Sequence, residues 1–316
     1  MLDPDLEAFL ELVAAGGGQP MHLAGPARAR ASYDAATLAI DAPGAELARV
    51  RELRVPVRDG AEVGARLYES RPDTGQPVLL FFHGGGYCVG GLDSHDSLCR
   101  DLADQAGCAV LALDYRLAPE HRFPTAFHDA VDAWQWLRGH AAALGLDPAR
   151  LAVGGDSAGG TLATALCLHA REAGAPAPCL QLLLYPCTSA HADFPSRARY
   201  AEGFLLEAAT LDWMYGNYLG AQGDARDWRF SPLSHPDLAG LPPAHVALAE
   251  HDLLVDEGRA YAQRLADAGV PVRLEVYEGM THDFARLGNI VTRTATLRRD
   301  LAQALRAAFA DRPVAA

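Results

Sequence analysis

A serine stands between glycines in the segment Gly155-Asp156-Ser157-Ala158-Gly159. A strand-like apolar run ends just before it, and a helix-like run begins just after it. A serine in such a tight turn presents its hydroxyl above the end of a sheet, where glycines are needed because side chains would collide with neighbouring backbone. The N-terminus of the following helix favours a developing oxyanion. The pattern therefore predicts Ser157 as the nucleophile of an acyl-transfer reaction.

A run of glycines, His83-Gly84-Gly85-Gly86, directly follows the apolar run 78–82. Backbone N–H groups in such a loop can face a substrate carbonyl without obstruction. A glycine-rich loop can also bind phosphate, but here neither a G-x-G-x-x-G pattern nor a following Gly-Lys is present. We therefore interpret the run as half of an oxyanion-binding site, with His83 as a structural donor that holds the loop.

A serine hydroxyl needs a histidine to take its proton and a carboxylate to orient that histidine. In the α/β-hydrolase fold, which the serine motif indicates, the acid and then the histidine follow the serine, each on a loop after a strand. Asp252 follows the strand-like run 245–249, and His282 follows the run 272–277. We therefore predict Asp252 as the orienting acid and His282 as the general base.

Other residues compete for these roles. Asp256 lies at the expected start of a helix, where a carboxylate stabilises the helix N-terminus, so we interpret it as a cap. Asp156 could tune the site electrostatically, but we expect its side chain to point away from Ser157. Further histidines follow the serine, none of them where the last strand ends: His169, His191, His235, His245 and His251.

Short apolar runs alternate with longer amphipathic stretches from about residue 50 onward. This rhythm is typical of a mostly parallel sheet with helices on both faces. Residues 1–48 and 188–240 lack the rhythm and are predicted to form N-terminal cap helices and a cap insertion. Residues 49–187 and 241–316 are predicted to form the catalytic core. The predicted strands are 53–57, 63–68, 78–82, 108–113, 151–153, 180–185, 245–249 and 272–277.

Composition narrows the class of function. A net charge of -13 disfavours nucleic acids and anionic membrane surfaces as partners. All 27 basic residues are Arg, and the absence of Lys excludes Schiff-base and Ser-Lys chemistry. The six cysteines form no C-x-x-C pair and are interpreted as buried free thiols in a reducing compartment, so we expect a cytoplasmic protein. The acidic N-terminal segment resembles no signal peptide, and no apolar run approaches the roughly 20 residues of a membrane helix.

The ordered motifs resemble those of the bacterial hormone-sensitive-lipase family of esterases, also called family IV, over almost the whole chain. The resemblance implies a carboxylesterase for short- to medium-chain esters, with a cap over its acyl pocket. It implies the backbone N–H groups of Gly84, Gly85 and Ala158 as oxyanion donors, with Gly86 left open. It also implies a homodimer formed through the last strand, 272–277. The motifs are HGGGY (83–87), DYRLAPEHRFP (114–124), GDSAGG (155–160), SPL (231–233), LPPAHVALAEHDLLVDEG (241–258) and GMTHDF (279–284).

The chain departs from this family at two places. Leu253 and Val255 stand where the family commonly has Pro and Arg, and Asp283 stands where Gly often follows the histidine. A carboxylate beside His282 favours the imidazolium form. We therefore expect the acid limb of the pH-rate profile to lie higher than in an Asp283→Gly variant.

The predicted reaction passes through an acyl-enzyme on Ser157 and requires no metal and no organic cofactor. A lactonase, an amidase or an acyltransferase could use the same residues. A ligand-binding protein that has kept the fold and lost turnover is the alternative from another class. Resembling plant hormone receptors have replaced the catalytic histidine, whereas His282 is present here.

Overall fold

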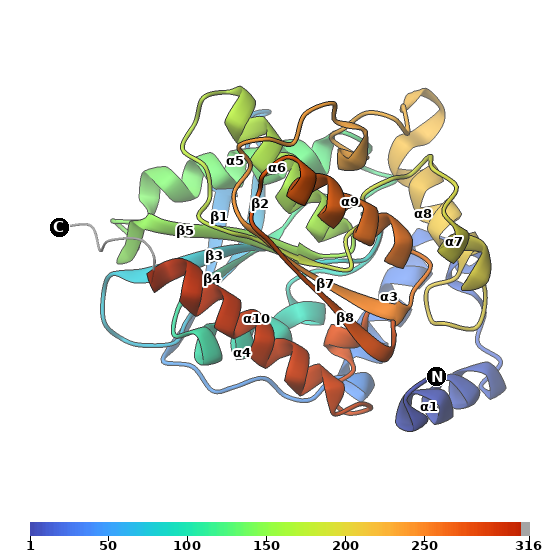
Figure 1. Ribbon diagram of the computed structural model, residues 1–316. Helices are drawn as coiled ribbons and strands as arrows, with labels where there is room; N and C mark the ends of the chain where they lie inside the picture. Colours follow the sequence, from blue (N-terminus) through green and yellow to red (C-terminus); the bar gives the residue numbers. More distant parts are fainter. Residues whose placement is uncertain (311–316) are drawn as a thin grey trace.

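The computed structural model describes residues 1–310, and residues 311–316, which the sequence assigns to the catalytic core, lie outside the described residues. The described chain forms one eight-stranded sheet in the order β1-β2-β4-β3-β5-β6-β7-β8 (Figure 1). β2 is antiparallel to β1 and β4, and the other neighbours are parallel. This is the predicted α/β-hydrolase architecture. The strands are β1 (Arg49–Pro56), β2 (Glu62–Glu69), β3 (Gln76–Phe82), β4 (Ala109–Asp114), β5 (Leu146–Asp156), β6 (Gln181–Leu184), β7 (Ala244–His251) and β8 (Val272–Thr281).

Helices cover both faces of the sheet (Figure 1). β3 and β6 are apolar after their first residue and buried along their whole length, so both of their faces need a covering layer. Leu80 of β3 packs into one hydrophobic core, and its neighbour Leu79 packs into the other. The helices α4 (Asp96–Ala106) and α10 (Arg293–Ala310) lie on one face, and α5 (Thr125–His140), α6 (Ala158–Glu172) and α9 (Val255–Asp267) lie on the other.

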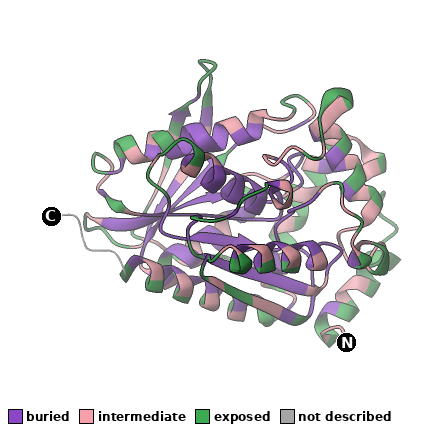
Figure 2. Cartoon of the chain, turned by 45° about the horizontal axis from the view of Figure 1, so that its top comes forward, coloured by how far each residue is buried: buried purple, intermediate pink, exposed green. Residues whose placement is uncertain are grey.

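Further helices gather beyond the carboxyl ends of the parallel strands (Figure 1). They come from the two segments that lack strand rhythm, and they are far more exposed than the sheet (Figure 2). Only Leu6 is buried in α1 (Pro4–Ala15), and only Ala29 is buried in α3 (Pro26–Ile40). These helices are α1 (Pro4–Ala15), α2 (Met21–Ala24), α3 (Pro26–Ile40), α7 (Pro195–Arg199) and α8 (Ala208–Leu219). Single 3₁₀ turns lie at Asp93–His95, Gly220–Gln222, Pro232–Ser234 and Phe284–Arg286.

Every predicted strand is present, and six of them are longer than their predicted runs, of which β1 and β5 show why. β1 begins at Arg49 because it is an edge strand whose outer residues are charged and half-exposed. β5 begins at Leu146 and includes the polar residues Asp147 and Arg150, which are paired with each other through an Arg Nε to carboxylate contact of 2.6 Å. These charged residues interrupt the apolar run, so the sequence pattern did not indicate the first part of β5.

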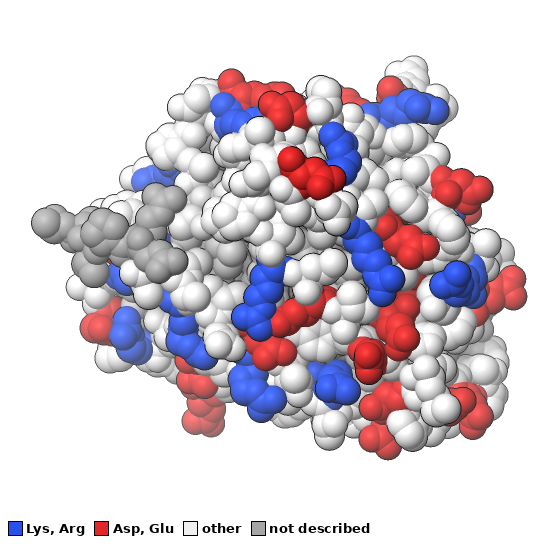
Figure 3. Space-filling view, viewed as in Figure 1, with Lys and Arg blue, Asp and Glu red and all other residues white. Residues whose placement is uncertain are grey.

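The surface carries both signs of charge. Arg side chains lie beside Asp and Glu side chains across the face shown in Figure 3. All six cysteine side chains are buried, as predicted. Within residues 1–310, no helix is both long enough and apolar enough to cross a membrane.

Candidate active site

Ser157 occupies the sharp turn between β5 and α6. Its backbone has φ 53° and ψ -120°, a conformation that side chains adopt only where surrounding structure enforces it. Its N–H donates to Leu184 O at 2.8 Å, which ties the turn to β6. A Cβ on Gly159 would lie 1.9 Å from Phe82 O, and one on Gly155 would lie 2.4 Å from the same oxygen. The glycines of the motif are therefore required by the close approach of β3.

The structure brings Ser157, His282 and Asp252 together at the ends of β5, β8 and β7. His282 Nε2 lies 2.9 Å from Ser157 Oγ, and His282 Nδ1 lies 2.6 Å from Asp252 Oδ2. The other oxygen of Asp252 accepts the N–H of Leu254 at 2.9 Å, which fixes the carboxylate. All three side chains are buried. The result is an unbroken chain of hydrogen bonds from a carboxylate, through an imidazole, to a hydroxyl.

The charges around His282 favour its protonated form. Burial lowers the pKa of His282, but the nearby carboxylates of Asp252, Asp283 and Asp156 outweigh burial. The pKa of His282 is therefore raised above its ordinary value. Such a histidine is well suited to accept the hydroxyl proton during nucleophilic attack.

The glycine loop differs from the expectation at Gly84. Its N–H donates to Asp156 Oδ1 at 2.8 Å and so is turned away from an incoming carbonyl. Gly85 and Gly86 line the cavity beside Ser157, and no described residue accepts their N–H groups. The N–H of Ala158 belongs to the first turn of α6, where helical N–H groups have no partner within the helix. Gly85, Gly86 and Ala158 thus present the free donors, and Gly84 does not.

His83 holds this loop from behind, as its structural interpretation requires. Its Nδ1 lies 2.7 Å from Gly84 O, a contact in which the imidazole donates. Its ring stacks on Tyr115 with centroids 4.2 Å apart, and Tyr115 OH donates to His83 O at 2.8 Å. Burial lowers the pKa of His83 to about 3, so the ring is neutral at ordinary pH.

Asp156 and His95 form a buried pair that the sequence did not reveal. The Asp156 carboxylate bonds to Gly84 and lies 3.2 Å from His95 Nε2 rather than contacting Ser157. His95 Nδ1 lies 2.9 Å from Ser94 Oγ. His95 precedes the serine in the chain, whereas the general base is expected after it, so no role was predicted for His95. Its position shortly after the glycine loop is a signal that it lies near the active site.

Asp256 lies in the first turn of α9, as the sequence predicts, but it is not the N-cap of the helix, which is Leu254. Its Oδ2 accepts the N–H of Ser196 at 2.9 Å, which joins α7 of the cap insertion to α9 of the core. The next residue, Glu257, is buried and accepts the N–H groups of Thr188 at 2.6 Å and Ser189 at 3.1 Å. Burial raises the pKa of Glu257 to about 8. Both carboxylates therefore attach the cap insertion to the helix that follows Asp252.

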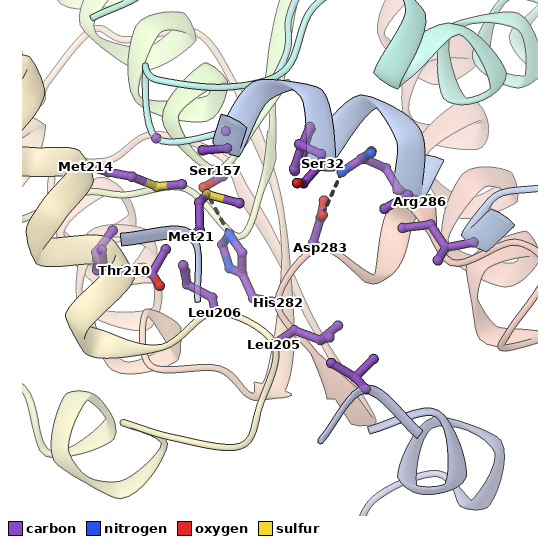
Figure 4. A pocket seen from close by; sticks show the side chains of 18 of the residues that line it. Met21, Ser32, Ser157, Leu205, Leu206, Thr210, Met214, His282, Asp283 and Arg286 are labelled. Carbon is purple, nitrogen blue, oxygen red and sulfur yellow. Dashed lines mark hydrogen bonds and ion pairs between the residues drawn. The ribbon is translucent and has the colours of Figure 1, made fainter. Parts of the chain in front are cut away.

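A cavity of about 370 Å³ opens onto Ser157 and His282 (Figure 4). Met214 of α8 forms one wall, with its Sδ so close to Gly86 that a Cβ there would lie 2.1 Å away. The cap supplies most of the lining, and that lining is chiefly apolar: Phe9, Val13, Met21, Ala24, Ala29, Ala36, Ile40, Leu205, Leu206, Leu211 and Met214. Within residues 1–310, no group of three His, Cys, Asp or Glu side chains is arranged to hold a metal ion.

Replacing Asp283 is expected to move the acid limb of the pH-rate profile. The Asp283 carboxylate raises the pKa of His282, so Asp283→Gly lowers that pKa and the free base persists to lower pH. Glycine suits the position because Asp283 has φ 66°. The measurement is kcat/KM for a neutral ester against pH, with Asp283→Asn as the uncharged control of similar size. Superimposable profiles for the wild type and both variants would show that Asp283 does not raise the pKa of His282.

The chain belongs to a family of α/β hydrolases, whose pattern matches residues 79–286. It is 47% identical over 300 residues to an ethyl acetate hydrolase of Pseudomonas putida, covering 92% of this chain and 94% of that protein. It is 43% identical over 264 residues to the carboxylic ester hydrolase LipN of Mycobacterium tuberculosis, covering 82% of this chain and 70% of LipN. The resemblance to the hormone-sensitive-lipase family is thereby confirmed.

Solved structures agree along the whole chain. An α/β-hydrolase enzyme from the metagenome of Lake Arreo, Spain, superposes with a TM-score of 0.95 at 37% identity, covering 98% of this chain and 99% of that one. A thermostable esterase from Pseudomonas putida ECU1011 superposes with a TM-score of 0.92 at 35% identity, covering 98% of each chain. The cap and the core therefore share one architecture with these relatives.

Proposed function

We infer that this protein is a serine carboxylesterase that hydrolyses small carboxylic esters, with Ser157 as nucleophile, His282 as general base and Asp252 as the orienting acid. The observation that carries the proposal is the hydrogen-bond chain of 2.6 Å and 2.9 Å that links the three side chains. The esterases and ester hydrolases among the relatives support the same reaction.

The proposed reaction has two halves. His282 Nε2 takes the proton of Ser157, and the serine oxygen attacks the ester carbonyl. The N–H groups of Gly85, Gly86 and Ala158 stabilise the resulting oxyanion. His282 then protonates the leaving alcohol and, in the second half, activates the water that releases the acid. Asp252 keeps the imidazole in the required tautomer and stabilises it when it is protonated.

The proposed substrates are esters with short to medium chains. At about 370 Å³ the cavity lies at the small end of the range of roughly 300–1,000 Å³ that small-molecule sites span. Its apolar lining suits an uncharged acyl chain. A relative named for ethyl acetate at 47% identity supports a small ester.

Other activities share this geometry. A lactonase, an amidase or an acyltransferase would use the same three residues, and the esterase relatives favour ester hydrolysis over these. A binding protein without turnover is disfavoured because His282 bonds to both of its partners. β8 lies at the edge of the sheet, and dimerisation through it stays a prediction, as does a cytoplasmic location.

Hydrolysis of 4-nitrophenyl esters from acetate to palmitate tests the proposal. We expect the highest kcat/KM at short to medium chains, because the cavity is small and the cap supplies most of its lining. Ser157→Ala is the control and should show no covalent turnover. A folded wild type that turned over no chain length would contradict the esterase assignment and favour a binding protein or a specialised substrate.

A further inference from the structure

The active-site cavity has a polar end that the proposed reaction does not use. Asp283 and Arg286 line this end, on the opposite side of Ser157 and His282 from Met214 (Figure 4). Asp283 stands directly after His282 in the chain. An ester bound at Ser157 therefore has one portion directed towards the apolar wall at Met214 and the other towards Asp283 and Arg286.

Arg286 is held by three hydrogen bonds and is almost fully buried. Its Nε donates to Ser94 O at 2.9 Å, its Nη1 to Asp283 Oδ2 at 2.7 Å and its Nη2 to Thr37 Oγ1 at 2.5 Å. The guanidinium lies 4.1 Å from the centroid of the Tyr33 ring, and Arg286 is only 1% exposed. Three of its five N–H groups donate in these contacts and the guanidinium is almost fully buried, so Arg286 serves as a buried clamp on one oxygen of Asp283.

The second oxygen of Asp283 remains available. No described residue donates to Asp283 Oδ1, and the Asp283 side chain is 24% exposed within the cavity lining. A carboxylate oxygen can only accept a hydrogen bond. Because Asp283 already forms an ion pair with Arg286, the polar end suits a neutral donor such as a hydroxyl better than a second cation.

The position of His282 identifies which part of the substrate meets this acceptor. His282 must protonate the leaving oxygen, so the alcohol portion of the ester lies against the imidazole. The chain continues from His282 directly into Asp283, which faces the same cavity. At the other end, Met214 packs against Gly86 of the glycine loop and leaves the apolar wall to the acyl portion.

We propose that Asp283 is a specificity-determining residue that selects esters whose alcohol portion carries a hydroxyl group, such as the monoesters of glycols and glycerol. Asp283 Oδ1 accepts a hydrogen bond from that hydroxyl, while Arg286 holds the carboxylate in place. An alkyl ester of equal length leaves this acceptor without a donor in a largely apolar cavity, which is unfavourable. The proposal rests on the esterase activity and names a substrate class for it.

Matched pairs of esters test the proposal. The monoacetates of ethylene, trimethylene and tetramethylene glycol are compared with propyl, butyl and pentyl acetate, which have the same numbers of heavy atoms. The measured quantity is the ratio of kcat/KM for each hydroxyl ester to that of its alkyl partner. For the best-fitting glycol, Asp283→Gly is expected to lower this ratio about tenfold, the size of one lost hydrogen bond. In Asp283→Asn the single amide oxygen accepts from Arg286 Nη1, and the NH₂ group replaces the free acceptor. This variant keeps the size of the side chain and should also lower the ratio, which separates loss of the acceptor from loss of volume.

Both kcat/KM values in the ratio are measured on the same variant, so a change in its folded fraction affects both equally and leaves the ratio unchanged. Glycine rather than alanine is used because φ at Asp283 is 66°, which strains a residue with a Cβ. A ratio in Asp283→Gly equal to that of the wild type, for all three glycols, would overturn the assignment. A wild type that hydrolyses none of the six esters or the 4-nitrophenyl esters would instead contradict the esterase function itself.

Discussion

Asp252→Asn is expected to lower kcat about 10⁴-fold while the protein stays folded. The amide can offer its NH₂ group to His282 Nδ1, which then becomes an acceptor, and the proton moves to Nε2. In that tautomer Nε2 cannot take the proton of Ser157, although the 2.9 Å contact between them persists. The measurement is kcat on the best 4-nitrophenyl ester, with circular dichroism to confirm folding.

Asp256→Asn is the matched control for this change. Asp256 lies four residues further along and bonds to Ser196 N instead of to an imidazole. Its replacement removes the same charge from the same region, and the amide oxygen can still accept the Ser196 N–H. We expect Asp256→Asn to change kcat less than tenfold, as a group outside the reacting atoms should. Equal losses in the two variants would contradict the role of Asp252.

Ser157, Asp252 and His282 could be identified from the sequence because each is marked by the residues next to it in the chain. Ser157 lies in a glycine turn that only a strand followed by a helix explains, and Asp252 and His282 each follow a strand near the end of the chain. Parallel strands place such loops at one edge of a sheet, so strand order along the chain was sufficient to bring the loops together. The exact pairing of β5 with β6 and of β7 with β8 was not needed.

The N–H groups that are free to bind the oxyanion could not be identified from the sequence in the same way. Which N–H groups of the loop are free depends on Asp156, which is 72 residues from Gly84 in the chain and accepts its N–H. His95 completes that contact from a third segment. Likewise the clamp between Arg286 and Thr37 joins residues 249 positions apart. Tertiary pairings of this kind leave no spacing pattern in one sequence.

Two carboxylates at the start of α9 have partners that the sequence did not indicate. Asp256 lies in the first turn of the helix, yet its side chain accepts a backbone N–H of α7. Helix N-termini attract carboxylates for reasons of charge alone, so position at a helix start indicates an acid without identifying its partner. The neighbouring Glu257 is engaged by two backbone N–H groups of the cap insertion.

Asp156→Ala is expected to lower kcat about 10²-fold, with little change in KM for a small ester. The substitution removes the acceptor of the Gly84 N–H and the partner of His95, both of which are buried. Gly85 and Gly86 then lose the anchor that aims their N–H groups at the oxyanion. Because the oxyanion exists only in the tetrahedral state, the loss should appear in kcat.

A boronic acid inhibitor separates this effect from general loosening of the fold. Its tetrahedral adduct on Ser157 places an oxygen where the oxyanion would lie, so its affinity should fall by about the same factor as kcat. Asp156→Asn, which keeps an acceptor oxygen for Gly84, is the matched variant and should retain most of both. If Asp156→Ala bound the inhibitor as tightly as the wild type, the anchor would not act through the oxyanion donors. Equal losses in the Ala and Asn variants would assign the effect to the charge of Asp156 instead of to its hydrogen bond with Gly84.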